Sequence, residues 1–122
     1  MDKFKYLNLN PLGIEEEDCV TRAIALASGK PYFTIRKKLQ LTAELLECEK
    51  LCVCCYEHLL DSVFNYERVK INGMTVGKFA ELHPKGVFLI RIEGHLTCLV
   101  NGCIYDLWDC RDRKATHAWI CE

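Results

Sequence analysis

The chain lacks both an excess of charge of one sign and any long apolar run. Its 122 residues carry 16 Lys and Arg against 17 Asp and Glu, a formal net charge of −1, so the composition does not predict a basic surface for nucleic acid. No apolar run approaches the roughly 20 residues that a membrane-spanning helix needs. Residues 1–6 also lack the apolar stretch of a signal peptide. We therefore expect a soluble, cytoplasmic protein that has neither nucleic acid nor membrane as a partner.

Internal repeats, low-complexity tracts and interdomain linkers are also missing. A chain of this length has the usual size of one domain, so residues 1–122 are predicted to form a single domain around one hydrophobic core. Hydrophobic residues make up 50% of the chain and charged residues 27%, a balance that excludes wholesale disorder. The sequence leaves the oligomeric state open.

Cysteine, in contrast, is abundant: the chain has nine. An even number in an exported chain would suggest a disulfide framework, whereas an odd number without an export signal favours a reducing compartment and free thiols. A free cysteine packs like a small apolar residue, so most of the nine need no functional role.

The first half of the chain has helical periodicity. After an irregular lead-in over residues 1–13, the acidic residues 15–18 mark the start of a helix, where the helix dipole favours negative charge. The segment Ser28–Pro31 marks its end, with glycine as the cap and proline beyond it. A short helix over about residues 32–39 and a longer one over about residues 42–65 are predicted to follow.

The second half consists mainly of short β-type runs separated by turn signals. Asn101-Gly102 is the strongest short hairpin signal in the chain. The predicted elements are a helix over 75–82 and strands over 87–92, 96–100, 103–108 and 118–121. Helices followed by a strand meander predict an α+β fold, with N-terminal helices packed on an antiparallel β-sheet.

Four cysteines and a histidine in the predicted long helix are of the types that bind zinc: Cys48, Cys52, Cys54, Cys55 and His58. Structural zinc sites usually bring two short ligand pairs together across a turn, whereas these residues fall within one continuous helical pattern. We therefore expect core-facing thiols and no bound metal or other cofactor. A zinc-binding protein is the alternative.

Three other residues form a candidate catalytic set. Cys19 lies in the first turn of the first predicted helix, where the dipole and free N–H groups lower a thiol pKa and favour the nucleophilic thiolate. His95 opens a predicted strand. A two-residue hairpin turn places Asp106 opposite Thr97, as a diagonal neighbour of His95 on the same face. The three supply a nucleophile, a base and an acceptor that orients the base.

Each member of this set also has a structural alternative. A single cysteine at a helix start is more often a packing residue than a nucleophile, and Asp106 could face solvent on an edge strand. Asp109 is a second candidate for the orienting role, and its opposite strand parity ranks it below Asp106.

Two segments resemble the signature blocks of small papain-like cysteine peptidases, a superfamily that includes the NlpC/P60 and C39 types and a compact group from bacteria and their phages. The segments are Asp18–Tyr32 and Gly94–Asp109. The resemblance implies a nucleophile at the start of a central helix on an antiparallel sheet, with Cys19 as nucleophile, His95 as general base and Asp106 as the orienting residue. It also implies a peptidase or amidase that cleaves a peptide or other amide through a thioester.

The chain departs from papain in the residue that would bind the oxyanion. Papain has a glutamine several residues before its cysteine, and no glutamine precedes Cys19. The candidate donors are the side-chain amides of Asn8 and Asn10, together with the backbone N–H of Cys19. A non-catalytic papain-like binding module is therefore an alternative function.

Overall fold

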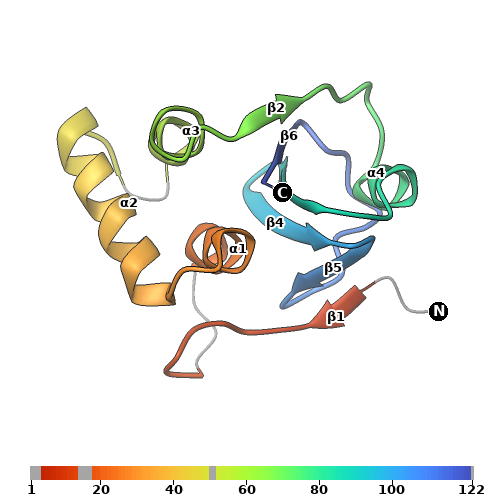
Figure 1. The fold of residues 1–122 in the computed structure, drawn as a ribbon, viewed down its shortest axis with the longest axis horizontal. Helices are drawn as coiled ribbons and strands as arrows, with labels where there is room; N and C mark the ends of the chain where they lie inside the picture. The colour runs from red at the N-terminus through yellow and green to blue at the C-terminus, as the bar shows by residue number, and fades with distance from the viewer. Residues whose placement is uncertain (1–3, 14–17, 50–51, 122) are drawn as a thin grey trace.

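The computed structural model describes residues 4–13, 18–49 and 52–121. Within these ranges six strands form one mixed sheet in the order β1-β5-β4-β3-β6-β2. Helices α1, α2 and α3 lie on one side of the sheet and α4 on the other (Figure 1). The elements in chain order are β1 (Phe4–Tyr6), α1 (Cys19–Ser28), α2 (Tyr32–Leu46), α3 (Val53–His58), the π-helical turn η1 (Leu59–Val63), β2 (Glu67–Val69), α4 (Val76–Leu82), β3 (Val87–Ile92), β4 (His95–Val100), β5 (Cys103–Asp106) and β6 (His117–Ile120).

The predicted α+β class is confirmed, but the prediction of a wholly antiparallel sheet is wrong. Strand β1 pairs in parallel with β5, with Phe4 opposite Ile104. It lies within the predicted irregular lead-in, and β2 was also absent from the prediction. Each of these strands has three residues, too few for an alternating pattern to show. Their partners, β5 and β6, come from distant parts of the chain.

The predicted helix boundary near residues 39–42 is wrong, because α2 continues through it. Thr42 lies inside α2, and its hydroxyl donates a hydrogen bond of 2.8 Å to the Lys38 carbonyl one turn earlier. A threonine with this bond is satisfied within a helix and does not end it.

The predicted continuous helix over residues 42–65 is also wrong, because α2 ends at Leu46. Glu47 adopts a left-handed conformation with φ of 55°. The N–H groups of Glu47 and Cys48 both bond to the Ala43 carbonyl, which closes the helix end. A new helix, α3, starts at Val53. None of the helices in the described ranges is long and apolar enough to cross a membrane.

The β-hairpin of the second half has the predicted register. Val100 pairs with Cys103 across the turn, and Cys98 pairs with Tyr105. Strand β3 has the predicted bounds, whereas β5 ends at Asp106, two residues before the predicted end. The side chain of Thr75 caps α4 by accepting a hydrogen bond from the Lys78 N–H, as its position predicted.

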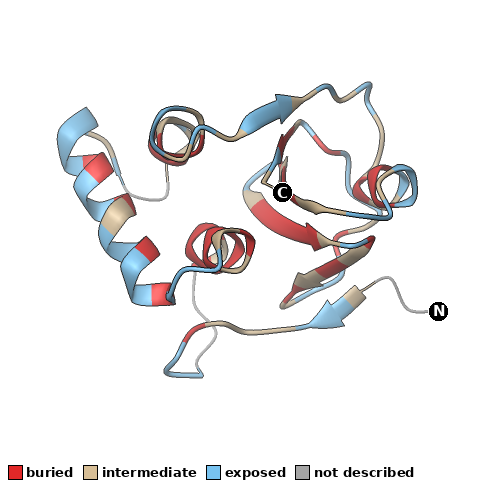
Figure 2. Ribbon diagram, viewed as in Figure 1, coloured by how far each residue is buried: buried red, intermediate tan, exposed pale blue. Residues whose placement is uncertain are grey.

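Helix α1 is buried almost all round, because it lies between the sheet and α2 (Figure 2). Its small and branched apolar residues, such as Ala23 and Ile24, share one core cluster with Leu96 of β4. On the opposite face of the sheet, Phe79 of α4 packs edge-on against Phe88. Cys19, the first residue of α1, packs against the cluster that contains Ala23, Ile24 and Leu96, which we call the α1 core cluster.

Candidate active site

His95 and Asp106 form a buried hydrogen-bonded pair on the β4–β5 hairpin. The distance from His95 Nε2 to Asp106 Oδ2 is 2.6 Å, and the side chains are 8% and 2% exposed. The register of the hairpin produces this contact, because His95 and Asp106 are diagonal neighbours on one face. The Leu107 N–H also donates to Asp106 Oδ1 at 2.7 Å.

The hydrogen bond changes the pKa of both partners in opposite directions. Burial alone would lower the pKa of His95, but its bonds to Asp106 and Cys19 outweigh this effect and raise the pKa to about 9. Burial alone would raise the pKa of Asp106, but the bond from His95 holds it below the ordinary value. Near neutral pH the imidazole is therefore charged and the carboxyl is ionised.

Cys19 forms a hydrogen bond with the His95 ring of this pair. Burial would raise the pKa of its thiol, but a side-chain hydrogen bond with His95 and a backbone hydrogen bond with Leu96 lower it below the ordinary value. The positive charges of His95 and Arg22 lower it further. Since Nε2 of His95 binds Asp106, Nδ1 is the ring nitrogen left for the sulfur. The three residues proposed from the sequence thus lie in one contact series.

Asp18 and Arg22 form a second buried network behind this series. Arg22 Nε lies 2.6 Å from Asp18 Oδ1, and Arg22 Nη1 lies 3.3 Å from Asp106 Oδ1. The Tyr32 hydroxyl donates to Asp18 Oδ2 at 2.8 Å, and the Asn10 amide donates to the same oxygen at 3.2 Å. Asp18 therefore holds Arg22 against Asp106. The i,i+4 spacing of Asp18 and Arg22 is the signal that could have indicated their ion pair.

Asn8 and Asn10 both take part in the turn that leads toward α1. Asn8 Oδ1 accepts a hydrogen bond from the Asn10 N–H, and Asn10 Oδ1 accepts one from the Leu12 N–H. Neither asparagine is among the described residues that line the hollow beside Cys19. Their role as oxyanion donors stays a prediction. The acidic residues 15–17, which were predicted to mark the start of the first helix, lie outside the described ranges.

The hollow beside Cys19 is narrow. Its volume is about 10 Å³, room for a single water molecule. Its lining residues are Leu7, Leu9, Cys19, Arg22, Ala23, Leu26, Leu96, Tyr105 and Asp106. Trp108 packs on the His95 ring, with centroids 4.9 Å apart, and is itself 38% exposed. An apolar wall and one partly exposed tryptophan thus surround the charged series.

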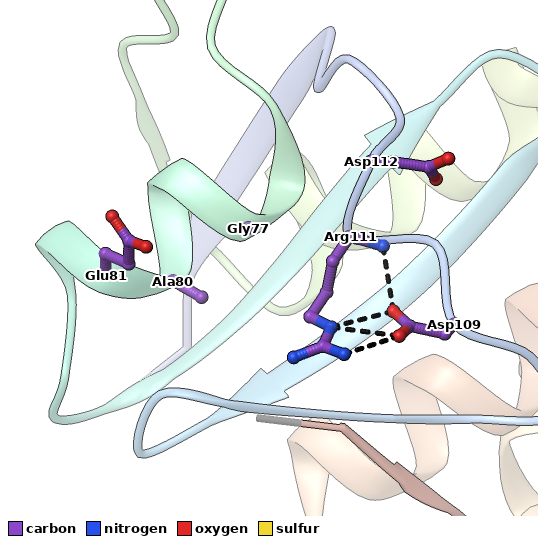
Figure 3. A pocket seen from close by; sticks show the side chains of 6 residues that line it. All are labelled: Gly77, Ala80, Glu81, Asp109, Arg111 and Asp112. Carbon is purple, nitrogen blue, oxygen red and sulfur yellow. Dashed lines mark hydrogen bonds and ion pairs between the residues drawn. The ribbon is translucent and has the colours of Figure 1, made fainter. Parts of the chain in front are cut away.

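A larger hollow of about 520 Å³ lies between α4 and the loop after β5 (Figure 3). It is lined by Gly77, Ala80, Glu81, Asp109, Arg111 and Asp112. Asp109 was the second choice for the orienting role. Its carboxylate binds the Arg111 guanidinium at 2.6 Å, whereas Asp106 is the carboxylate that binds His95.

All nine cysteines are free thiols, and two groups of side chains among the described residues could hold a metal ion. In one group the ligand atoms of His95, Asp106 and Cys110 lie within 4.8 Å of one another. Burial raises the pKa of Cys110 to about 12, and His95 and Asp106 already bind each other at 2.6 Å. The second group consists of Cys48, Cys52 and Cys54.

Comparison of the chain with protein-family models, curated proteins and solved structures finds no match. The chemistry of the candidate site therefore has to be argued from its own geometry.

Proposed function

We propose that the protein is a cysteine hydrolase of papain-like type that cleaves an amide bond in a peptide or other amide substrate. The observation that carries the proposal is the contact series Cys19–His95–Asp106, in which the pKa of the thiol is lowered and that of the imidazole is raised to about 9. These opposite directions favour a thiolate–imidazolium pair near neutral pH, the state in which a cysteine is a ready nucleophile.

Each residue has a distinct task in the proposed reaction. The Cys19 thiolate attacks the carbonyl carbon and forms a C–S bond, and the carbonyl electrons move onto oxygen. The His95 imidazolium gives its proton to the amide nitrogen, so the C–N bond breaks and the amine leaves. Water then attacks the thioester while His95 takes a proton from it, and the C–S bond breaks to release the acid.

The surrounding residues hold this arrangement in place. Asp106 accepts from His95 Nε2 and fixes the ring orientation, while Arg22 holds Asp106 from behind. The first N–H groups of α1, including that of Cys19, start a helix of ten residues and have no carbonyl partner one turn earlier within that helix. In the proposal they stabilise the oxyanion, a contribution that typically changes the rate by about 10²–10³ per donor.

The test is to trap the covalent intermediate. The chain is incubated with p-nitrophenyl acetate, quenched in acid and digested, and acetylated cysteines are located by mass spectrometry. We expect acetylation concentrated at Cys19, abolished in Cys19→Ala, and reduced in His95→Ala. Cys103→Ser, which removes a half-buried thiol on β5, is the matched control and should leave the signal unchanged. A peptide mixture then identifies cleavable amides.

Acetylation spread evenly over the exposed thiols, or unchanged in His95→Ala, would show that Cys19 is not activated. The papain-like module would then be a binding domain, as the sequence argument allowed.

A further inference from the structure

Three cysteine sulfurs lie close together where α2 ends and α3 begins. The Sγ atoms of Cys48, Cys52 and Cys54 all lie within 4.8 Å of one another, and those of Cys52 and Cys54 are 2.9 Å apart. Cys54 is exposed, and the other two are half-buried at the edge of the α1 core cluster. We refer to these three residues as the thiol cluster.

The break between the two helices creates the thiol cluster. Cys48 follows the left-handed Glu47 that ends α2, and Cys52 is the N-cap of α3. The Cys52 N–H donates to the Glu49 carbonyl at 2.9 Å, which holds the N-cap of α3 near the end of α2. In a continuous helix these sulfurs would lie along one side; because α2 ends at Leu46 and α3 starts at Val53, they instead lie close together. The objection that the sequence raised against a zinc site therefore does not hold for the folded chain.

We infer that the thiol cluster binds one zinc ion, with Cys55 as the fourth ligand. Zinc binds four thiolates in a tetrahedron with Zn–S distances of about 2.3 Å, which places the sulfurs about 3.8 Å apart. The three sulfurs of the cluster lie within 4.8 Å of one another, and the Cys52–Cys54 pair at 2.9 Å needs to open by roughly 1 Å to reach that spacing.

Cys55 is not among the three residues whose sulfurs lie within 4.8 Å of one another, so its side chain has to turn toward them to become the fourth ligand. Its sulfur interacts with the Cys48 thiol and lies within electrostatic range of Cys52 and Cys54. Its present partner is the Leu39 carbonyl of α2, at 3.3 Å, a weak bond that rotation of the side chain releases. Zinc binding replaces the thiol protons with bonds to the metal, and the protons pass to the solvent.

The ion would act as a clamp between two helices. Helix α3 has only six residues and passes directly into the π-helical turn η1, so it has little intrinsic stability. A tetrathiolate site would tie its first turn to the end of α2, and the free energy of metal binding would add to the free energy of folding. The site is separate from the proposed hydrolase chemistry, since Cys19 is not one of its ligands.

Cobalt is the most direct probe. The full chain, reduced and stripped of metal, is titrated with Co²⁺, and the sulfur-to-cobalt charge-transfer and visible bands are recorded. We expect bands typical of tetrahedral sulfur ligation that saturate at about one ion per chain and disappear when Zn²⁺ is added. Cys54→Ser should lose the bands, and its exposed position makes the variant safe for folding. Cys103→Ser is the matched control and should retain them.

Other results would overturn the inference. The absence of cobalt bands in the unaltered chain, or bands retained in both Cys54→Ser and Cys52→Ser, rules out the site. A Cys52–Cys54 disulfide in the isolated chain, together with no metal binding after its reduction, would show a redox pair instead. Bands of unchanged shape in Cys55→Ser would remove Cys55 from the ligand set.

Discussion

Cys19 and the thiol cluster contain the same side chain in two different settings. Cys19 faces a charged imidazole held by a buried carboxylate, which lowers the pKa of its thiol. The sulfurs of Cys48, Cys52 and Cys54 face mainly one another. One setting stabilises a single reactive thiolate, and the other offers several sulfurs to one cation. The neighbours of each cysteine, more than its own chemistry, thus separate the two proposed roles.

The largest effect should be the loss of stability when the charged network behind Cys19 is broken. Arg22→Met leaves the carboxylate of Asp18 buried without its cation and leaves Asp106 with His95 alone, so we expect the free energy of unfolding to fall by about 3–5 kcal/mol. Urea denaturation measures it. Arg36→Met, on the exposed side of α2, is the matched control and should change stability by less than about 0.5 kcal/mol. Equal effects of the two variants would mean that the network does not hold the site together.

The next largest effect concerns the reactivity of Cys19. His95→Ala removes a charge-assisted hydrogen bond of the kind worth about 1.5–3 kcal/mol, so iodoacetamide labelling of Cys19 near pH 6 should slow by roughly 10–100-fold. Mass spectrometry of each cysteine gives the rates, and Cys103 in the same sample serves as the internal control. If Cys19 in the unaltered chain reacts no faster than Cys103, the lowered pKa of its thiol is disproved.

A smaller effect follows from the pH dependence of stability. In Cys19→Ser, His95 still binds Asp106, so its folded pKa stays above the ordinary value of 6.5. Between pH 6.5 and that raised pKa the folded chain holds one proton more than the unfolded chain, so the free energy of unfolding should fall as pH rises, by about 1.4 kcal/mol for each pH unit in this interval. In the unaltered chain the folded state has one proton more on His95 but one fewer on Cys19 than the unfolded state. The two differences cancel, so the free energy of unfolding should not change with pH in this range.

Urea denaturation at a series of pH values tests this cancellation. The double variant Cys19→Ser, His95→Gln lacks both the thiol and the imidazole, so its free energy of unfolding should not fall over this pH range. A slope in the unaltered chain as steep as that in Cys19→Ser would contradict the thiolate–imidazolium pair.

The smallest effect should be that of the thiol cluster on the reactivity of Cys19. Cys54→Ser is expected to change the labelling rate of Cys19 by less than about twofold, because the variant removes no contact of Cys19. The phenol of Tyr56 lies within electrostatic range of both Cys19 and Cys52. A change of fivefold or more, absent in Cys103→Ser, would reveal coupling through that route.

The β-hairpin and the residues of the proposed site could be predicted because their signals are local. Asn101-Gly102 fixes the turn, the turn fixes the register, and the register places Asp106 beside His95. The position of Cys19 in the first turn of a helix was predicted from the acidic residues 15–18, the last of which, Asp18, is the N-cap of α1.

The helical half was harder to predict, because its breaks do not interrupt the apolar pattern. Leu39 of α2 and Cys55 and Leu59 further along are all buried in the same core cluster, so the periodicity continues across the turn between the helices. Glu47 carries no sequence signal of its left-handed conformation, since glycine or asparagine is the usual residue there.

The sequence by itself determined the α+β class, the hairpin and its register, and so the placing of His95 beside Asp106, because turn chemistry and alternation act between near neighbours. Only the tertiary structure decided the parallel pairing of β1, the Asp18–Arg22–Asp106 network and the meeting of the cluster sulfurs. Each of these depends on how segments pack around the shared core. Burial there requires charged and polar groups to find partners, and apart from the i,i+4 pair Asp18–Arg22 no local pattern specifies them.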